Sequence, residues 1–240
     1  DHIVLVNATG THRANTPDEL AQMLGSDVVR DYRIVNHNAF DKSTLTKVGQ
    51  LDGGTPVWLN AEFVKAKRRI VAGFIEPHFF AGFSGGPKMV APGVAGIDTT
   101  LELHSARLIS DPRATWGRTD GNPLWEAICD CARLVDVDFS VNVTINKRHQ
   151  VTNVFAGDLW QAHRIGVEFA RKTSMRGVPQ SFDIVVATNA GYPLDQNLYQ
   201  TVKGMSAAAQ IVRPGGAIVI ASECSDGIPE HGNFKKLLKQ

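Results

Sequence analysis

The chain has 240 residues, of which 43% are hydrophobic and 20% charged, and its formal net charge is +1. This balance gives no electrostatic basis for binding nucleic acid or an anionic membrane surface, and no apolar stretch approaches the roughly 20 residues that span a bilayer. The three cysteines are too few for a disulfide framework and fit a reducing, cytoplasmic setting. The length predicts one large or two modest domains.

The first part of the chain predicts short strands and one well-defined helix. Thr16 as cap and Pro17 in the first turn predict a helix over 17–24, which Gly25 ends. Apolar runs predict strands at 3–8, 33–36, 56–60 and 68–75.

Residues 74–98 combine many glycines and prolines with four phenylalanines. A solvated loop would be polar, whereas an apolar, glycine-rich loop indicates backbone held close to another group, such as a cofactor. We therefore expect this stretch to contribute to a functional site.

The second part predicts helices, a hairpin and a final βαβ unit. Helices are expected at about 98–109, 122–134 and 158–173, a hairpin at 138–145 and 150–156, and a linker at 174–181. Strands at Phe182–Thr188 and Ala217–Ser222, joined by a helix at 196–212, predict a parallel sheet. Cys129 and Cys131 are expected in or near the core.

These elements predict an α/β protein with a mixed-sheet N-terminal domain at 1–175 and the start of a second α/β domain, with a parallel βαβ unit, at 181–240. Asp1 leads almost directly into a core strand, and the last residues begin a helix. We therefore expect a segment of a longer protein.

Three segments each carry a histidine outside an apolar helix face: Thr9–Arg13, Glu76–Lys88 and Leu101–Ala106. Histidine carries protons near neutral pH and is the commonest metal ligand, and a lysine that ends a glycine loop can bind phosphate or a cofactor. Taken singly, each histidine is more often a structural hydrogen-bonding group. The phosphate-loop motif is excluded because Pro87 precedes Lys88 and no hydroxyl follows it. Dinucleotide, zinc and serine-hydrolase motifs are also absent from the sequence.

Four motifs together resemble those of the lactate racemase family. They are Thr9-Gly-Thr-His-Arg13, the run from Glu76-Pro-His78 to Gly-Gly-Pro-Lys88, the helix with His104, and Tyr199-Gln-Thr-Val-Lys203. The resemblance implies racemisation of a small 2-hydroxyacid. It also implies a nickel-pincer nucleotide, a pyridinium-3-thioamide-5-thiocarboxylic acid mononucleotide that binds nickel through sulfur, carbon and sulfur and that other enzymes must make.

The resemblance also implies roles for individual residues. Lys88 would hold the cofactor covalently beside Ser84, Gly85 and Gly86, and His104 would bind nickel, for which imidazole is a suitable ligand. His12 and His78 would act as paired acid and base, and Tyr199, Gln200 and Lys203 would lie at the substrate.

Hydride transfer to such a cofactor avoids a carbanion, because a flat 2-keto acid forms and can take hydride back on its other face. The family's arginine for the substrate carboxylate precedes the point at which this sequence begins, and neither Arg13 nor Arg33 takes its place. The family also has a longer C-terminal domain.

Two other functions remain open on the residues alone. The first is a metal-dependent hydrolase or lyase that uses His12, His78 and His104 on a conventional metal ion. The second is a nucleotide-cofactor-binding fragment without catalytic activity. For a racemase, lactate, malate and larger 2-hydroxyacids are all open as substrates.

Overall fold

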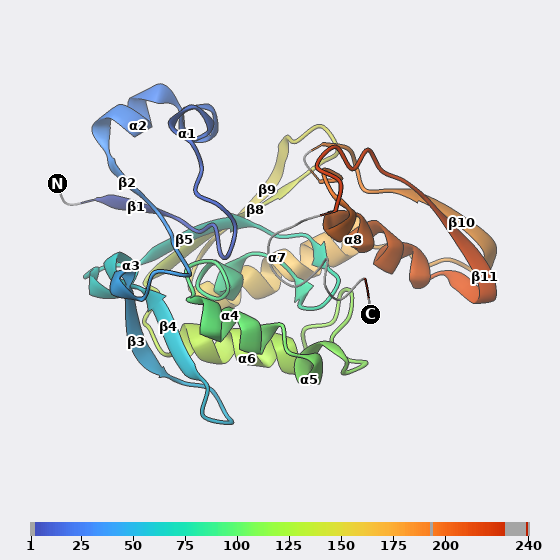
Figure 1. Ribbon diagram of the computed structural model, residues 1–240, viewed down its shortest axis with the longest axis horizontal. Coiled ribbons are helices and arrows are strands. Elements are labelled where there is room, and N and C mark those ends of the chain that lie inside the picture. The colour runs from blue at the N-terminus through green and yellow to red at the C-terminus, as the bar shows by residue number, and fades with distance from the viewer. Residues whose placement is uncertain (1–2, 193, 229–238, 240) are drawn as a thin grey trace. The chain divides into compact units, whose positions relative to one another are not determined.

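The structure is a computed structural model that describes residues 3–192, 194–228 and 239 (Figure 1). The chain divides into two compact units, Asp1–Met175 and Arg176–Gln240. No helix of the described residues is both long and apolar enough to cross a membrane.

Unit 1 begins with a parallel strand pair connected by two helices. Its elements are β1 (Val4–Asn7), α1 (Pro17–Leu24), α2 (Ser26–Asp31) and β2 (Arg33–Asn36). The hydroxyl of Thr16 accepts from the backbone N–H of Glu19, whose carboxylate accepts from the N–H of Thr16. This reciprocal capping box explains why α1 begins where the sequence predicted.

A β-hairpin follows and supports the segment that leads to His104. Its strands are β3 (Leu45–Gln50) and β4 (Pro56–Asn60), with η1 (Lys42–Thr44) before them and the short α3 (Ala61–Lys65) after them. The hydroxyl of Thr99 accepts from the N–H of Trp58 at 3.0 Å and donates to the carbonyl of Pro56 at 3.1 Å. These bonds hold α4 (Ile97–Leu103) against β4.

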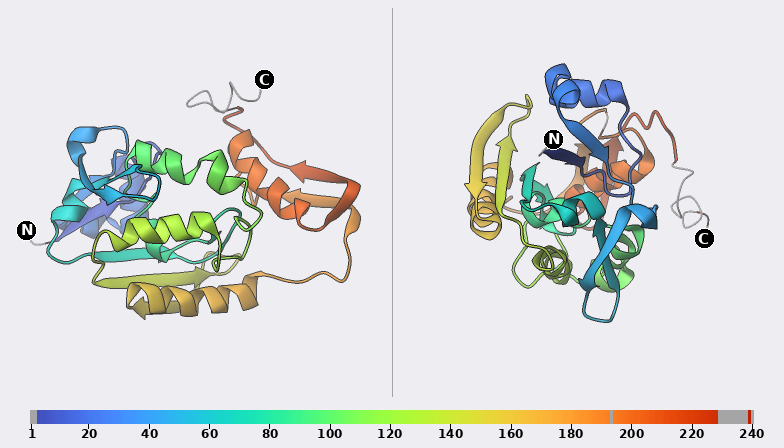
Figure 2. Two further views of the ribbon diagram at one scale, coloured as in Figure 1. Left: turned by 90° about the horizontal axis from the view of Figure 1, so that it is seen from below. Right: turned by 90° about the vertical axis from the view of Figure 1, so that its left-hand side faces the viewer.

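The central sheet of unit 1 is mixed, as predicted. β5 (Ile70–Phe74) runs parallel to β8 (Phe139–Ile145), which pairs antiparallel with β9 (Val151–Gly157). Figure 2 shows this sheet between α6 (Pro123–Arg133) and α7 (Leu159–Ser174). Cys129 and Cys131 lie in the core, where burial raises the pKa of each thiol to about 12.

Short elements between β5 and α6 contain most of the candidate site. They are β6 (Pro77–His78), β7 (Gly82–Phe83), η2 (Gly86–Met89), α4 (Ile97–Leu103) and α5 (Ala106–Ile109). The prediction of one helix over 98–109 is wrong. Ser105 has extended backbone, with φ −65° and ψ 149°, so the helical hydrogen-bond ladder is interrupted there and His104 lies at the end of α4.

Unit 2 confirms the predicted parallel βαβ arrangement. β10 (Phe182–Thr188) and β11 (Val212–Ala221) pair in parallel and are joined by α8 (Leu198–Ala209). The sequence placed the end of the helix and the start of the second strand too late. Val212 already pairs with Phe182, ahead of a register shift that the glycines after Pro214 accommodate.

Candidate functional site

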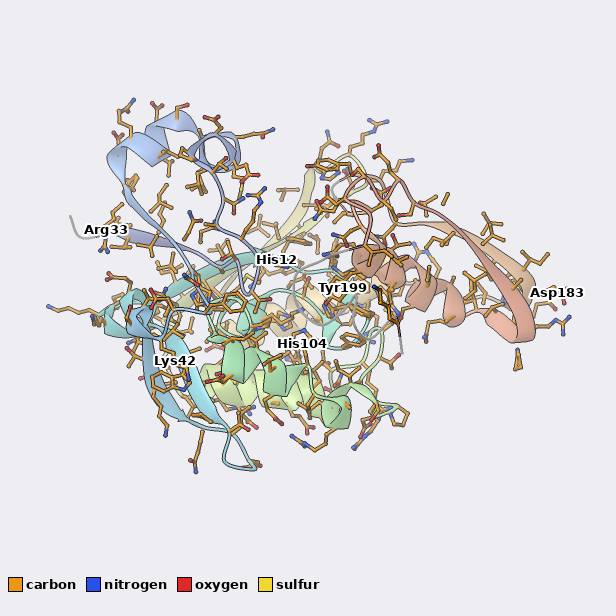
Figure 3. All side chains as sticks on the ribbon, viewed as in Figure 1. His12, Arg33, Lys42, His104, Asp183 and Tyr199 are labelled. Atoms are coloured by element: carbon orange, nitrogen blue, oxygen red, sulfur yellow. The ribbon has the colours of Figure 1, made fainter. Side chains whose placement is uncertain are left out.

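His12 lies on the exposed loop that follows β1 (Figure 3). The hydroxyl of Thr9 donates to the carbonyl of His37 at 3.0 Å, and the N–H of Gly10 donates to the carbonyl of Gly93 at 2.9 Å. The N–H of His12 donates back to the carbonyl of Thr9 at 3.0 Å. The loop is thereby tied to the segment that connects η2 with α4.

Three asparagines close the base of the His12 loop. The amide of Asn7 donates to the side-chain oxygens of Asn15 at 2.9 Å and Asn36 at 2.8 Å, and the amide of Asn36 donates to the carbonyl of Asn15 at 3.1 Å. These bonds hold both ends of the loop together while His12 itself remains exposed.

His78 is half-buried at the start of a tight turn. Its Nδ1 accepts from the N–H groups of Phe80 and Ala81, both at 3.2 Å. Neutral imidazole has one donor and one acceptor nitrogen, so neutral His78 carries its proton on Nε2. Asn122, the cap of α6, donates to the carbonyl of Phe80 at 2.8 Å and holds the turn in place.

Lys88 is half-buried in η2, and only Pro87 separates it from the turn of Ser84, Gly85 and Gly86. The hydroxyl of Ser84 donates to the carbonyl of Phe74 at 2.9 Å and accepts from the N–H of Glu76 at 2.9 Å. The N–H of Lys88 donates to the carbonyl of Gly85 at 3.1 Å. The hydroxyl of Ser84 therefore joins the two arms of the segment that leads to Lys88.

His104 combines a fixed ring with an accessible position. Its Nδ1–H donates to the carbonyl of Thr100 at 2.8 Å, and more than a third of the residue is exposed. Desolvation by the surrounding protein lowers the pKa of His104, the bond to Thr100 raises it, and the positive charge of Lys88 lowers it further. Lys88 and His104 are therefore close enough to interact electrostatically.

Two buried hydroxyl groups on either side of His104 in the sequence, those of Thr100 and Ser105, have no hydrogen-bond partner among the described residues. Unsatisfied buried polar atoms are rare in native proteins, and a bound ligand or water is the usual partner of such an atom. Together with Lys88 they make the end of α4 a polar position.

The three histidines do not form a conventional metal site. Within residues 3–192 and 194–228, no group of three or more His, Cys, Asp or Glu side chains is arranged to hold a metal ion. The structure therefore gives no support to a hydrolase or lyase that binds its metal through His12, His78 and His104. A group that brings most of its own metal donors needs only one protein ligand.

The predicted substrate residues lie in the first two turns of α8 in unit 2. Asn197 caps this helix by accepting from the N–H of Gln200 at 3.0 Å. Tyr199 is 43% exposed, and Gln200 and Lys203 are half-buried. The helix starts beyond the carboxyl end of β10, which is the edge where open α/β sheets bind ligands.

Residues 1–117 match the family model described as the lactate racemase N-terminal domain, and residues 178–240 match the lactate racemase C-terminal domain. The chain belongs to the lactate racemase family. Along 98% of its length it is 37% identical to the lactate racemase of Thermoanaerobacterium thermosaccharolyticum and 39% identical to that of Lactiplantibacillus plantarum. It covers 55% of each, so it spans about half the length of the curated relatives it matches.

Solved structures confirm the α/β fold. The lactate racemase apoprotein from Thermoanaerobacterium thermosaccharolyticum matches with a TM-score of 0.92 and 38% identity, over 96% of this chain and 55% of that one. A protein from Thermotoga maritima matches with a TM-score of 0.67 and 23% identity, over 77% of this chain and 50% of that one, and this likeness concerns the fold alone.

Two polar residues that contact the turn of Ser84, Gly85 and Gly86 were missed in the sequence analysis, because neither lies in the four motifs. They are Asn142 on β8 and His163 on α7, whose contacts with Gly86 and Ser84 are at 2.8 and 2.9 Å. The sequence does mark both residues, because each is a polar residue at a buried position of an amphipathic strand or helix. The histidines singled out from the sequence were those outside an apolar helix face, whereas His163 is buried on such a face of α7.

Proposed function

We propose that this chain is the part of a 2-hydroxyacid racemase that holds the cofactor and moves the hydroxyl proton, with lactate or a similar small 2-hydroxyacid as substrate. One observation carries the proposal. His104, with its Nδ1–H fixed on Thr100, lies within the electrostatic reach of Lys88, in a chain whose curated relatives are lactate racemases.

The residues around His104 fit a nickel-pincer nucleotide. Donation from Nδ1 to a backbone carbonyl leaves the lone pair on Nε2 for a metal, which is the usual arrangement of a ligating histidine. Imidazole is a suitable ligand for nickel. Lys88 would hold the nucleotide covalently, His104 would bind its nickel, and the hydroxyls of Thr100 and Ser105 would gain polar neighbours.

When bound, the nucleotide would supply a centre that takes up hydride from the substrate carbon and returns it to either face. His12 would accept the hydroxyl proton of one enantiomer, for which its exposed loop leaves access, and would return it to the same oxygen as the opposite enantiomer forms. His78 in its neutral form would donate a hydrogen bond from Nε2 to the substrate oxygen.

The two histidines are therefore not equivalent. To accept a proton at Nε2, neutral His78 must first carry its own proton on Nδ1, where two backbone N–H groups now point. His104 is fixed in the opposite form, with the proton on Nδ1. Nitrogen-15 NMR of the cofactor-free protein should find Nε2–H at His78 and Nδ1–H at His104. The reverse pair would contradict these roles.

Unit 2 would contribute substrate contacts. Lys203 would pair with the carboxylate or an oxygen of the 2-hydroxyacid, and Gln200 and Tyr199 would donate hydrogen bonds. The cofactor would come from the separate enzymes that make it, in the cytoplasm.

Production of the full-length protein with and without the cofactor-making enzymes tests the function. With them, we expect added mass at Lys88, about one nickel per chain and conversion of enantiopure L-lactate into both enantiomers by chiral chromatography. Without them, all three should be absent. Bound cofactor without conversion of any 2-hydroxyacid would support the non-catalytic alternative, and no added mass with the enzymes present would refute cofactor binding.

A further inference from the structure

The turn that precedes Lys88 is held by two side chains from distant elements. The Nε2–H of His163 on α7 donates to the carbonyl of Ser84 at 2.9 Å, and the Oδ1 of Asn142 on β8 accepts from the N–H of Gly86 at 2.8 Å. One bond lies on either side of Gly85, so the backbone of the turn is fixed at both positions.

Both side chains are shielded from water. His163 is 4% exposed and Asn142 is fully buried, so their hydrogen bonds are costly to leave unmade. The ring of His163 also stacks on Trp125, with centroids 4.9 Å apart and planes at 18°. Burial lowers the pKa of His163 to about 4. The ring is therefore neutral at pH 7, with its one proton directed at Ser84.

The glycines let the turn rest directly on these two side chains. Gly85 and Gly86 have φ values of 77° and 50°, which glycine adopts most readily. A Cβ on Gly86 would lie 2.5 Å from Cδ2 of His163, and one on Gly85 would lie 2.8 Å from Oδ1 of Asn142. The close packing of His163 and Asn142 against the turn therefore requires glycine at positions 85 and 86.

Lys88 follows the turn and donates its N–H to the carbonyl of Gly85, so its direction depends on the turn. We propose that His163 and Asn142 are positioning residues that direct the amine of Lys88 toward the cofactor. What Lys88 holds rests on the function proposed above, whereas the geometry of the turn can be tested without any cofactor.

Two substitutions at His163 separate positioning from packing. His163→Phe keeps an aromatic ring against Trp125 but removes the donor to Ser84. His163→Gln keeps an N–H donor at the same reach from the backbone and removes the ring. His149→Asn, at an exposed residue of the β8–β9 turn, is the matched control, because Asn tolerates the positive φ of 60° found there.

Two measurements on the cofactor-free protein report on the turn. In His163→Phe we expect amide hydrogen exchange at Gly86 and Lys88 to accelerate about tenfold, because a buried carbonyl loses its partner. The acylation rate of Lys88, relative to the exposed Lys147, should change as well. His163→Gln and His149→Asn should keep both values near those of the unaltered protein.

Asn142→Leu should reproduce the result of His163→Phe from the other side of the turn. Equal changes in His163→Gln and His163→Phe, or changes spread evenly over the amides of unit 1, would show a merely structural role and overturn the proposal. Unchanged amide exchange and Lys88 acylation in His163→Phe would also overturn it.

The loaded protein separates this inference from the proposed function. Produced with the cofactor-making enzymes, His163→Phe should carry less covalent adduct on Lys88 than His163→Gln does. If the unaltered protein takes up no adduct, the proposed function fails, while exchange and acylation still decide whether His163 and Asn142 set the position of Lys88. Equal adduct in both variants would overturn the inference.

Discussion

Two segments of unit 1 that carry candidate site residues are built in opposite ways. In residues 84–104, buried side chains from α7 and β8 hold the turn before Lys88, and the ring of His104 is fixed on its own helix. In residues 8–15, the bonds of Asn7 and Asn36 to Asn15 hold the ends of the loop together, Arg13 pairs with Glu19, and the residue His12 is exposed. The first arrangement suits a group that must hold a cofactor in one position. The second suits a proton carrier that must meet a substrate.

Substitutions in residues 84–104, the anchoring segment, should have the largest effects on cofactor and nickel content. Lys88→Ala should abolish the covalent adduct, because no other amine replaces its role in the motif. His104→Ala should keep the adduct but lower nickel content at least about tenfold, since even outer-shell partners of a metal ligand change affinity by that much. Intact mass and nickel analysis of the loaded full-length protein check both, with His149→Asn as control.

Substitutions of the two histidines that act on the substrate should leave Lys88 and His104 intact. His12→Ala should lower the racemisation rate by about 10²–10⁴-fold, the usual contribution of a general acid or base. His78→Ala should lower it by about 10²–10³-fold, the usual contribution of a hydrogen-bond donor to a reacting oxygen. Nickel content and adduct mass should remain at the level of the unaltered protein. Nickel lost in His12→Ala but kept in His104→Ala would mean that the two segments have exchanged roles.

Local signals explain how much of the fold was predictable. α1, α6 and α7 begin beside Thr16, Asn122 and Asp158, whose side chains accept from backbone N–H groups of the first turn. β3 was missed because Leu45–Gln50 mixes exposed and half-buried positions and its pairing with β4 shifts register. The break at Ser105 was missed because nothing in the neighbouring residues marks it.

The candidate site likewise has a part that the sequence predicts and a part that it does not. Motifs that are contiguous in the sequence predict Lys88, His104, His12 and His78 as site residues. The contacts of Asn142 with Gly86 and of His163 with Ser84 join residues 56 and 79 positions apart. Such contacts depend on how β8 and α7 pack on the turn, and this packing is a property of the fold.

Acid should destabilise the anchoring segment through His163. The pKa of this ring is about 4 in the folded chain and near 6.5 when the chain is unfolded. As pH falls from 6.5 to 4, the unfolded chain binds a proton that the folded chain does not, so stability is lost, and it is regained as pH rises. The loss is about 3 kcal/mol from this group alone.

Urea unfolding at pH 7 and pH 4 measures this loss. His163→Gln removes the titrating group and should reduce the difference in unfolding free energy between the two pH values by about 3 kcal/mol. His37 remains in both proteins and acts in the same direction, because burial also lowers its pKa. Glu19 and Asp111 have pKa values lowered to about 2 and lose their stabilising effect at lower pH. An unchanged pH dependence in His163→Gln would contradict the assignment.

The smallest expected effect concerns the loop of His12. Asn36 accepts from the amide of Asn7 and donates to the carbonyl of Asn15, so Asn36→Ala should lower the unfolding free energy by about 1–2 kcal/mol. The remaining ties, from Thr9 to His37 and from Gly10 to Gly93, keep the loop near its place. Racemisation should therefore fall by no more than about tenfold, less than when His12 itself is removed.

Nickel content decides what an Asn36→Ala result means. If the two segments act separately, the variant should retain its full nickel and adduct, because none of its lost bonds reaches Lys88 or His104. A parallel loss of nickel would show that the His12 loop also supports the anchors, through the bond from Gly10 to Gly93 that joins it to the segment before α4. In that case the loop of His12 and the turn before Lys88 would form one structural element, since a change at the base of the loop would be transmitted to the turn.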